Sequence, residues 1–138
     1  MSRRGLALKD LKVTLRGRLL VDLNLTVQPG SVLCLVGPSG MGKSTTMAAI
    51  AGTLPRDFDM TGEITLDGRQ IGSLPTWERR VGLLFQDALL FPHLSVAGNL
   101  ALGLKPKRGE VRKAVTEAAL ARIGLEGFGA RDPATLSG

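Results

Sequence analysis

One short glycine-rich segment, residues 37–44 with the sequence GPSGMGKS, constrains this chain more than any other. It fits the pattern G-x-x-x-x-G-K-[ST] at every fixed position. Glycines let the backbone wrap so closely that successive N–H groups converge on phosphate oxygens. Lys43 can bring an ammonium to the β and γ phosphates, and Ser44 can offer its hydroxyl to Mg²⁺. The pattern predicts a phosphate-binding loop, whose residues are Gly37, Pro38, Ser39, Gly40, Met41, Gly42, Lys43, Ser44 and Thr45.

The glycine-rich segment could be a ligand-binding loop or a tight glycine turn without a ligand. The flanking sequence favours the ligand-binding loop. Residues 31–36 form a short apolar run, which predicts a strand buried on both faces. From Lys43 to Leu54, apolar residues recur at helical spacing, and Pro55 is expected to end that helix. A strand, a glycine loop and a helix in this order are the context that a phosphate loop requires.

Other strands are predicted on both sides of the loop. Leu6–Leu15 and Leu19–Val27 alternate between apolar and polar residues across a short basic turn, which predicts an antiparallel pair. Gly62–Gly68 contains a short alternating strand. Arg80–Phe85 has the apolar pattern of another buried strand, and it ends at Gln86.

Helical patterns follow Gln86. Ser95 is expected to cap a helix that ends near Leu102. Gly109–Gly124 is predicted to be amphipathic, and its apolar side is expected to consist of Val111, Ala114, Val115, Ala118 and Ala121. The change of pattern predicts two parts, residues 1–87 with the loop and residues 88–138 with the helices.

Composition narrows the class of protein. The 138 residues carry a formal charge of +6, and 43% of them are hydrophobic, as in globular proteins. Basic residues are scattered and aromatic residues are few, so we expect no nucleic-acid partner. A single cysteine, Cys34, excludes an internal disulfide and is expected to be a small core residue. No apolar stretch is long enough for a membrane-spanning helix.

Four motifs in order resemble the ATP-binding subunits of ABC transporters. They are the loop phrase VGPSGMGKSTT from Val36 with IAG from Ile50, the hairpin GEI-LDG from Gly62, the phrase VGLLFQ ending at Gln86, and the final LSG from Leu136. The phrase FPHLSV from Phe91, with Asn99 after it, resembles the importer branch. The resemblance implies an α/β fold: a P-loop NTPase (RecA-like) core, an N-terminal antiparallel β subdomain and the start of a helical subdomain.

The resemblance also implies roles for individual residues. Lys43 and Gln86 would be catalytic, and Ser44 and Gln86 would contact the Mg²⁺ that accompanies ATP. An amide oxygen can coordinate a cation or accept a hydrogen bond from water, although Gln86 could also be an exposed residue at a strand end. Ser137 and Gly138 would contact the nucleotide bound by the opposite subunit of a head-to-tail dimer, and Ser137 could equally cap a helix.

The sequence departs from the family pattern in two places. The family usually stacks adenine on an aromatic residue near the start, and Leu15 occupies that position here. The family's acidic pair after an apolar strand is not found in these residues. The switch histidine is not found either, because the single histidine, His93, belongs to the importer phrase. We therefore expect the 138 residues to be a fragment that ends within the signature motif and is inactive by itself.

The resemblance implies an ATPase that couples ATP binding and hydrolysis to import of a small solute. Its expected partners are transmembrane permease subunits, a second ATP-binding subunit and, indirectly, a solute-binding protein. Its expected location is the cytoplasmic face of the inner membrane. Two alternatives remain, an ABC-family ATPase without a transport role and a non-catalytic nucleotide-binding fragment. The uncharged stretch from Ala88 to Leu104 favours transport, because a transport subunit needs a surface for its membrane partner.

Overall fold

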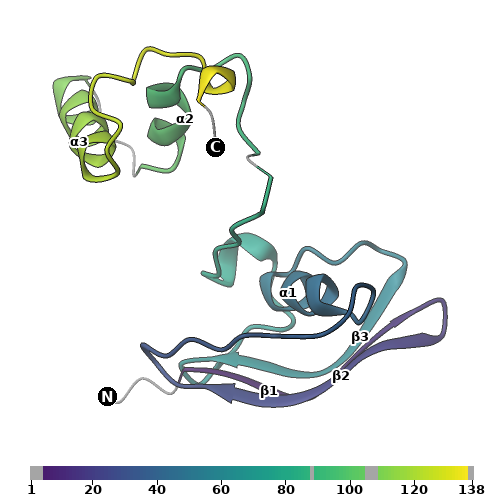
Figure 1. Ribbon diagram of the computed structural model, residues 1–138. Coiled ribbons are helices and arrows are strands. Elements are labelled where there is room, and N and C mark those ends of the chain that lie inside the picture. Colours follow the sequence, from purple (N-terminus) through teal and green to yellow (C-terminus); the bar gives the residue numbers. More distant parts are fainter. Residues whose placement is uncertain (1–4, 88, 105–108, 137–138) are drawn as a thin grey trace. The chain divides into compact units, whose positions relative to one another are not determined.

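The computed structural model describes residues 5–87, 89–104 and 109–136 (Figure 1). The chain divides into two compact units, residues 1–84 and residues 85–138. The first unit contains β1 (Leu6–Leu15), β2 (Arg18–Val27), α1 (Lys43–Ala51), β3 (Phe58–Leu66), β4 (Arg69–Gln70) and the 3₁₀ helix η1 (Thr76–Glu78). The second unit contains α2 (Val96–Leu102), α3 (Gly109–Arg122) and the 3₁₀ helix η2 (Pro133–Thr135).

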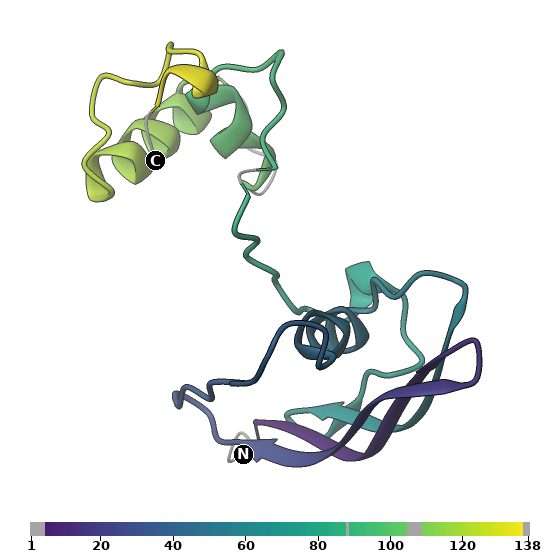
Figure 2. The ribbon, with the colours of Figure 1, turned by 45° about the vertical axis from the view of Figure 1, so that its right-hand side comes forward.

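A four-stranded antiparallel sheet is the framework of the first unit. Its strand order is β2-β1-β3-β4. Leu6 lies opposite Val27 and Leu15 lies opposite Arg18, so the predicted pairing of the first two strands is confirmed. The predicted strand within Gly62–Gly68 is also present, but it belongs to the longer β3. Figure 2 shows the twist of the three long strands and α1 lying over one face of the sheet.

The hydrophobic core of this unit lies where α1 packs on the sheet. Leu11, Val13 and Ile64 are fully buried, and Ile50 of α1 joins the same cluster. Burying an aliphatic side chain of this size stabilises a fold by about 1.5–3 kcal/mol. The core therefore holds α1, and with it the loop that precedes α1, against the sheet.

Two predicted buried strands are not strands in the structure. Residues 31–36 and 80–85 have no regular secondary structure, and Val32, Val36 and Leu84 are 89%, 92% and 100% exposed. A strand exists only where a neighbour accepts and donates its backbone hydrogen bonds, and no described segment pairs with either run. Cys34 lies in the first run and is exposed, so its predicted burial is wrong as well.

The helix after the loop is shorter than predicted. It ends at Ala51 instead of Leu54, because Gly52 adopts a left-handed conformation with φ of 80°. The N–H groups of Gly52 and Thr53 both donate to the Ala48 carbonyl, which closes the last turn. This arrangement is a glycine cap, so Gly52 and not Pro55 ends the helix.

In the second unit the predicted start of α2 is confirmed, whereas the predicted apolar face of α3 is wrong. The Ser95 hydroxyl accepts a hydrogen bond from Gly98 N at 3.2 Å, so Ser95 caps α2 as expected. The buried residues of α3 are Thr116 and Leu120, whereas Val111 of the predicted apolar side is 55% exposed. Ala114, Ala118 and Ala121 are not buried either. Thr116 can be buried because its hydroxyl donates to the Arg112 carbonyl.

Among the described residues, no helix is long and apolar enough to cross a membrane.

Candidate phosphate-binding site

The loop from Gly37 to Gly42 runs directly into the first turn of α1. Gly40 and Gly42 adopt left-handed φ values of 81° and 76°, which only glycine tolerates without strain. A Cβ atom on Gly42 would lie 2.6 Å from the Leu20 carbonyl oxygen and 2.9 Å from Val21 Cγ2. The second glycine of the motif thus allows the loop to approach β2 closely.

Lys43 folds its ammonium group back over the loop. Its Nζ donates to the carbonyl oxygens of Gly37 at 2.5 Å and Pro38 at 2.6 Å. The side chain is half-buried, and these two contacts hold its charge over the loop at the start of the helix. A mobile ammonium at this place can exchange carbonyl contacts for phosphate oxygens, to which charge-assisted hydrogen bonds are stronger.

Backbone donors of the loop are available to a ligand. The N–H groups of Ser39, Gly40, Met41 and Gly42 donate to no backbone carbonyl within the described ranges. The adjoining first turn of α1 has no acidic residue to neutralise its positive dipole end. Unpaired N–H groups and a helix N-terminus together fit the oxygens of a phosphate chain.

The residues after Lys43 divide into accessible and structural ones. Ser44 is not buried, so its hydroxyl is accessible as an oxygen ligand for Mg²⁺. Thr46 is 2% exposed, and its hydroxyl donates to the Gly42 carbonyl at 2.9 Å. Thr46 therefore fixes the turn, whereas Ser44 is free to act on a ligand. The sequence pattern predicted the role of Ser44 but not the structural role of Thr46.

The far end of α1 is held by a residue that the sequence analysis missed. Arg79 is 6% exposed, and its guanidinium donates to the carbonyls of Ala49 at 2.7 Å and Ile50 at 3.2 Å. Burial lowers the pKa of Arg79 below its ordinary value through desolvation. No periodic pattern marks a buried arginine in a loop, so nothing in the sequence indicated this contact.

Gln86 belongs to the second unit, where its side chain is exposed. A role in coordinating Mg²⁺ or water stays a prediction. Among the described residues no group of three or more His, Cys, Asp or Glu side chains could hold a metal ion. Ser137 and Gly138 lie outside the described residues, so their predicted contact with a second nucleotide also stays a prediction. Leu15 is half-buried at the end of β1, beside the β1–β2 turn.

The importer phrase forms a compact turn organised by Asn99. The Asn99 side-chain oxygen accepts from Phe91 N at 2.8 Å, and its amide nitrogen donates to the carbonyls of Phe91, Leu94 and Ser95 at 3.1, 3.2 and 3.1 Å. The His93 ring makes an edge contact with Phe91. Asn99 thus has a specific structural task, which its position in the sequence did not reveal.

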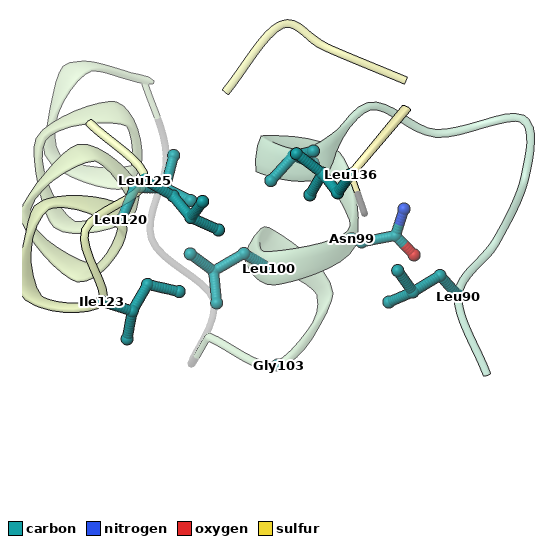
Figure 3. A pocket seen from close by; sticks show the side chains of 9 residues that line it. Leu90, Asn99, Leu100, Gly103, Leu120, Ile123, Leu125 and Leu136 are labelled. Carbon is teal, nitrogen blue, oxygen red and sulfur yellow. The ribbon is translucent and has the colours of Figure 1, made fainter. Parts of the chain in front are cut away.

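Next to this turn, a groove of about 400 Å³ opens between α2 and α3. In Figure 3 the side chain of Leu120 from α3 lies at the left and that of Leu100 from α2 in the middle, with Leu136 above and Leu90 at the right. The full lining is Leu90, Val96, Asn99, Leu100, Gly103, Leu120, Ile123, Leu125 and Leu136. The surface is almost entirely apolar, so the groove suits an apolar side chain better than a charged metabolite.

Comparison with known proteins assigns the chain to a family. Residues 20–138 match the family described as ABC transporter, and the chain belongs to this family. The ABC transporter ATP-binding protein YnjD of Escherichia coli (strain K12) is 46% identical over 135 residues, which are 96% of this chain and 62% of that protein.

Two further relatives carry names that state a cargo. A Fe(3+) ions import ATP-binding protein of Streptomyces coelicolor is 44% identical over 137 residues, covering 96% of this chain and 38% of the relative. A thiamine import ATP-binding protein of Jannaschia sp. (strain CCS1) is 39% identical over 135 residues, covering 96% of this chain and 57% of the relative. The chain therefore spans 38% to 62% of the length of these three relatives.

Proposed function

We propose that this chain supplies the nucleotide-binding part of an ATPase that powers import of a small solute. The proposal is carried by the loop itself, where the N–H groups from Ser39 to Gly42 donate to no backbone carbonyl of the described residues and lie in the same loop over which Lys43 folds its ammonium. ATP would supply the phosphate chain, and Mg²⁺ would neutralise its charge when bound. Within the chain, Gly37 to Thr45 would hold the phosphates and Ser44 would contact the cation.

The proposed fold of the whole protein is a RecA-like P-loop core, with residues 1–87 in the core and β subdomain and residues 88–138 in a helical subdomain. Gln86 would then carry information about the γ-phosphate between the two parts. Ser137 and Gly138 would act on the nucleotide of a second, head-to-tail subunit. We also propose that the 138 residues alone hydrolyse essentially no ATP, because no acidic pair follows an apolar strand in them.

The proposed partners are transmembrane permease subunits, which would hold this chain at the cytoplasmic face of the inner membrane, and indirectly a solute-binding protein. The apolar groove between α2 and α3 supports this, because it could receive an apolar side chain from a partner helix. The relatives' names, which mention import of ferric ions and thiamine, support transport over the alternative of an ABC-family ATPase without a membrane partner.

The test is assembly with a permease. The gene product at its native length is co-expressed with the membrane protein encoded beside it, and the complex is purified in detergent. Leu90→Asp places a charge in the groove, where Leu90 is 47% exposed. We expect this variant to lose the permease while keeping its thermal midpoint. Leu19→Asp, at a site that is 51% exposed on β2, is the matched control and should copurify normally.

Phosphate release gives the second readout of the same preparation. We expect the complex to hydrolyse ATP and the Lys43→Ala complex to lose this activity. A protein that hydrolyses ATP fully without any membrane partner, with Leu90→Asp silent, would contradict the transport role and favour the non-transport ATPase.

A further inference from the structure

The buried side chain of Arg79 makes four hydrogen bonds to backbone carbonyls. Its Nε donates to the Leu74 carbonyl at 2.7 Å, and Nη2 donates to the Gly72 carbonyl at 2.6 Å. Nη1 donates to the last-turn carbonyls of Ala49 and Ile50 in α1. One buried guanidinium therefore joins the C-terminal end of α1 to the segment that follows β4.

Only arginine can make this arrangement. Its planar fork presents five N–H donors in fixed directions, whereas a lysine ammonium is a single point with three donors. The guanidinium also requires the absence of a neighbouring side chain, since a Cβ on Gly52 would lie 2.5 Å from Arg79 Nε. Its charge faces carbonyl oxygens, which complement the negative dipole end of α1.

The position of Arg79 along the chain places it between the phosphate loop and the segment that leads to Gln86. α1 begins at Lys43 beside the phosphate loop and ends at Ala51 near the Arg79 guanidinium. Arg80 then adopts a left-handed φ of 58°, and Val81 packs against the core. From there residues 82–85 lead along the chain to Gln86.

We propose that Arg79 is a positioning residue that transmits nucleotide binding at the first turn of α1 to residues 81–86. The inference rests on the proposed function, because it needs a nucleotide at the loop. In the proposed route the nine-residue helix α1 would move as one body, so that a shift at Lys43 would reach Ala49 and Ile50. The guanidinium carries that shift through contiguous hydrogen bonds to Gly72 and Leu74, and through the backbone to Val81.

A matched control separates transmission from plain stability. Thr76 Oγ1 donates to the Gly52 carbonyl at 2.6 Å, so it ties the same helix end to the same segment without the guanidinium. Thr76→Val removes that tie, and Arg79→Lys removes the fork while keeping a charge. Both variants remove a contact at the C-terminal end of α1 and should lower stability there. Only Arg79→Lys breaks the proposed route.

The experiment measures amide hydrogen exchange of residues 81–86 in the native-length protein, with and without saturating Mg·ATP. We expect nucleotide to slow exchange there in the wild type and in Thr76→Val. In Arg79→Lys the nucleotide-dependent slowing should fall about tenfold, while ATP affinity stays within about threefold of wild type. Lys43→Ala serves as the variant without a functional loop.

A second measurement needs no substitution at Arg79. The Nε–H proton of Arg79 is buried and bonded to the Leu74 carbonyl, so its NMR resonance is a direct probe of the contact. We expect Mg·ATP to shift this resonance in the wild type and to leave it unchanged in Lys43→Ala. This readout holds even if Arg79→Lys fails to fold.

The outcomes separate this inference from the proposed function. If the wild type binds ATP through Lys43 but the Nε–H resonance does not respond, transmission through Arg79 is wrong and the proposed function stands. Equal loss of slowing in Arg79→Lys and Thr76→Val would also overturn it. If the wild type shows no Lys43-dependent binding, the proposed function fails and the transmission fails with it.

Discussion

Gly42 shows how a single residue connects the glycine-rich loop of residues 37–42 to the sheet. Its left-handed φ of 76° turns the chain into α1, and its missing side chain leaves room for the Leu20 carbonyl. The Gly42 carbonyl in turn accepts from Thr46 N at 2.8 Å and from the Thr46 hydroxyl. The orientation of the loop amides therefore depends on this residue, although it has no side chain to contact a ligand.

We expect Gly42→Ala to destabilise the first unit and to weaken nucleotide binding. A residue other than glycine at this φ costs about 1–3 kcal/mol, and the contact with Leu20 adds to that cost. The measurement is thermal unfolding together with ATP titration. Gly17→Ala is the control, because Gly17 has a φ of 79° but a Cβ atom there would meet nothing within 4 Å. Equal effects of the two substitutions would contradict a specific role of Gly42.

Sequence reasoning predicted which residues form the candidate loop but not which residues hold it in place. Gly42, Lys43 and Ser44 form a motif at fixed spacing, which a single chain reveals. Arg79 acts on carbonyls that lie 30 and 29 residues away along the chain, and no spacing rule relates such partners. The roles of supporting polar residues could therefore be read only from the folded structure.

At the scale of elements, α2 depends on its capping interactions. It has seven residues, which is too few for an isolated helix to be stable in water. Ser95 caps its first turn, and the N–H groups of Val96 and Ala97 donate to the Arg131 and Gly129 carbonyls. The start of α2 thus binds the segment that precedes η2.

We expect Asn99→Asp to loosen the turn from Phe91 to Ser95. Aspartate keeps an acceptor for Phe91 N but loses the donations to three carbonyls, each worth about 0.5–1.5 kcal/mol. Amide exchange of residues 91–99 should quicken in this variant, and should quicken further in Asn99→Ala. Asn24→Asp, a substitution in β2 of the first unit, is the control. Unchanged exchange at Phe91 in Asn99→Ala would show that the turn holds without the amide.

Element boundaries were predictable where a local signal set them. The β1–β2 pair follows from alternation, and the start of α2 follows from Ser95. The apolar side of α3 was misjudged, because small alanines gave the pattern while the buried contacts are made by Thr116 and Leu120. The Thr116 hydroxyl donates to a carbonyl of its own helix, so this polar residue can be buried. A prediction from hydrophobicity alone places apolar residues at such positions.

At the scale of the whole molecule, two apolar runs lack strand partners within the described chain. Residues 31–36 and 80–85 have the composition of buried strands, yet neither forms one. An apolar composition predicts that a segment forms a buried strand when other elements cover both of its faces. Whether the strand forms depends on a neighbouring strand that pairs with it. A parallel arrangement depends on contacts between distant segments, which makes it the least predictable part of an α/β fold from one sequence.

The proposed function depends on the loop from Gly37 to Thr45 binding the phosphates of ATP. The most direct test is calorimetric titration of Mg·ATP into the native-length protein, the Lys43→Ala variant and the Lys113→Ala variant. Lys113 is an exposed lysine on α3, so Lys113→Ala removes the same charge as Lys43→Ala at a site outside the loop. Losing a charge-assisted contact worth about 1.5–3 kcal/mol should weaken binding by about 10- to 150-fold in Lys43→Ala alone. Equal affinity in all three proteins would show that the loop does not bind the phosphates of ATP.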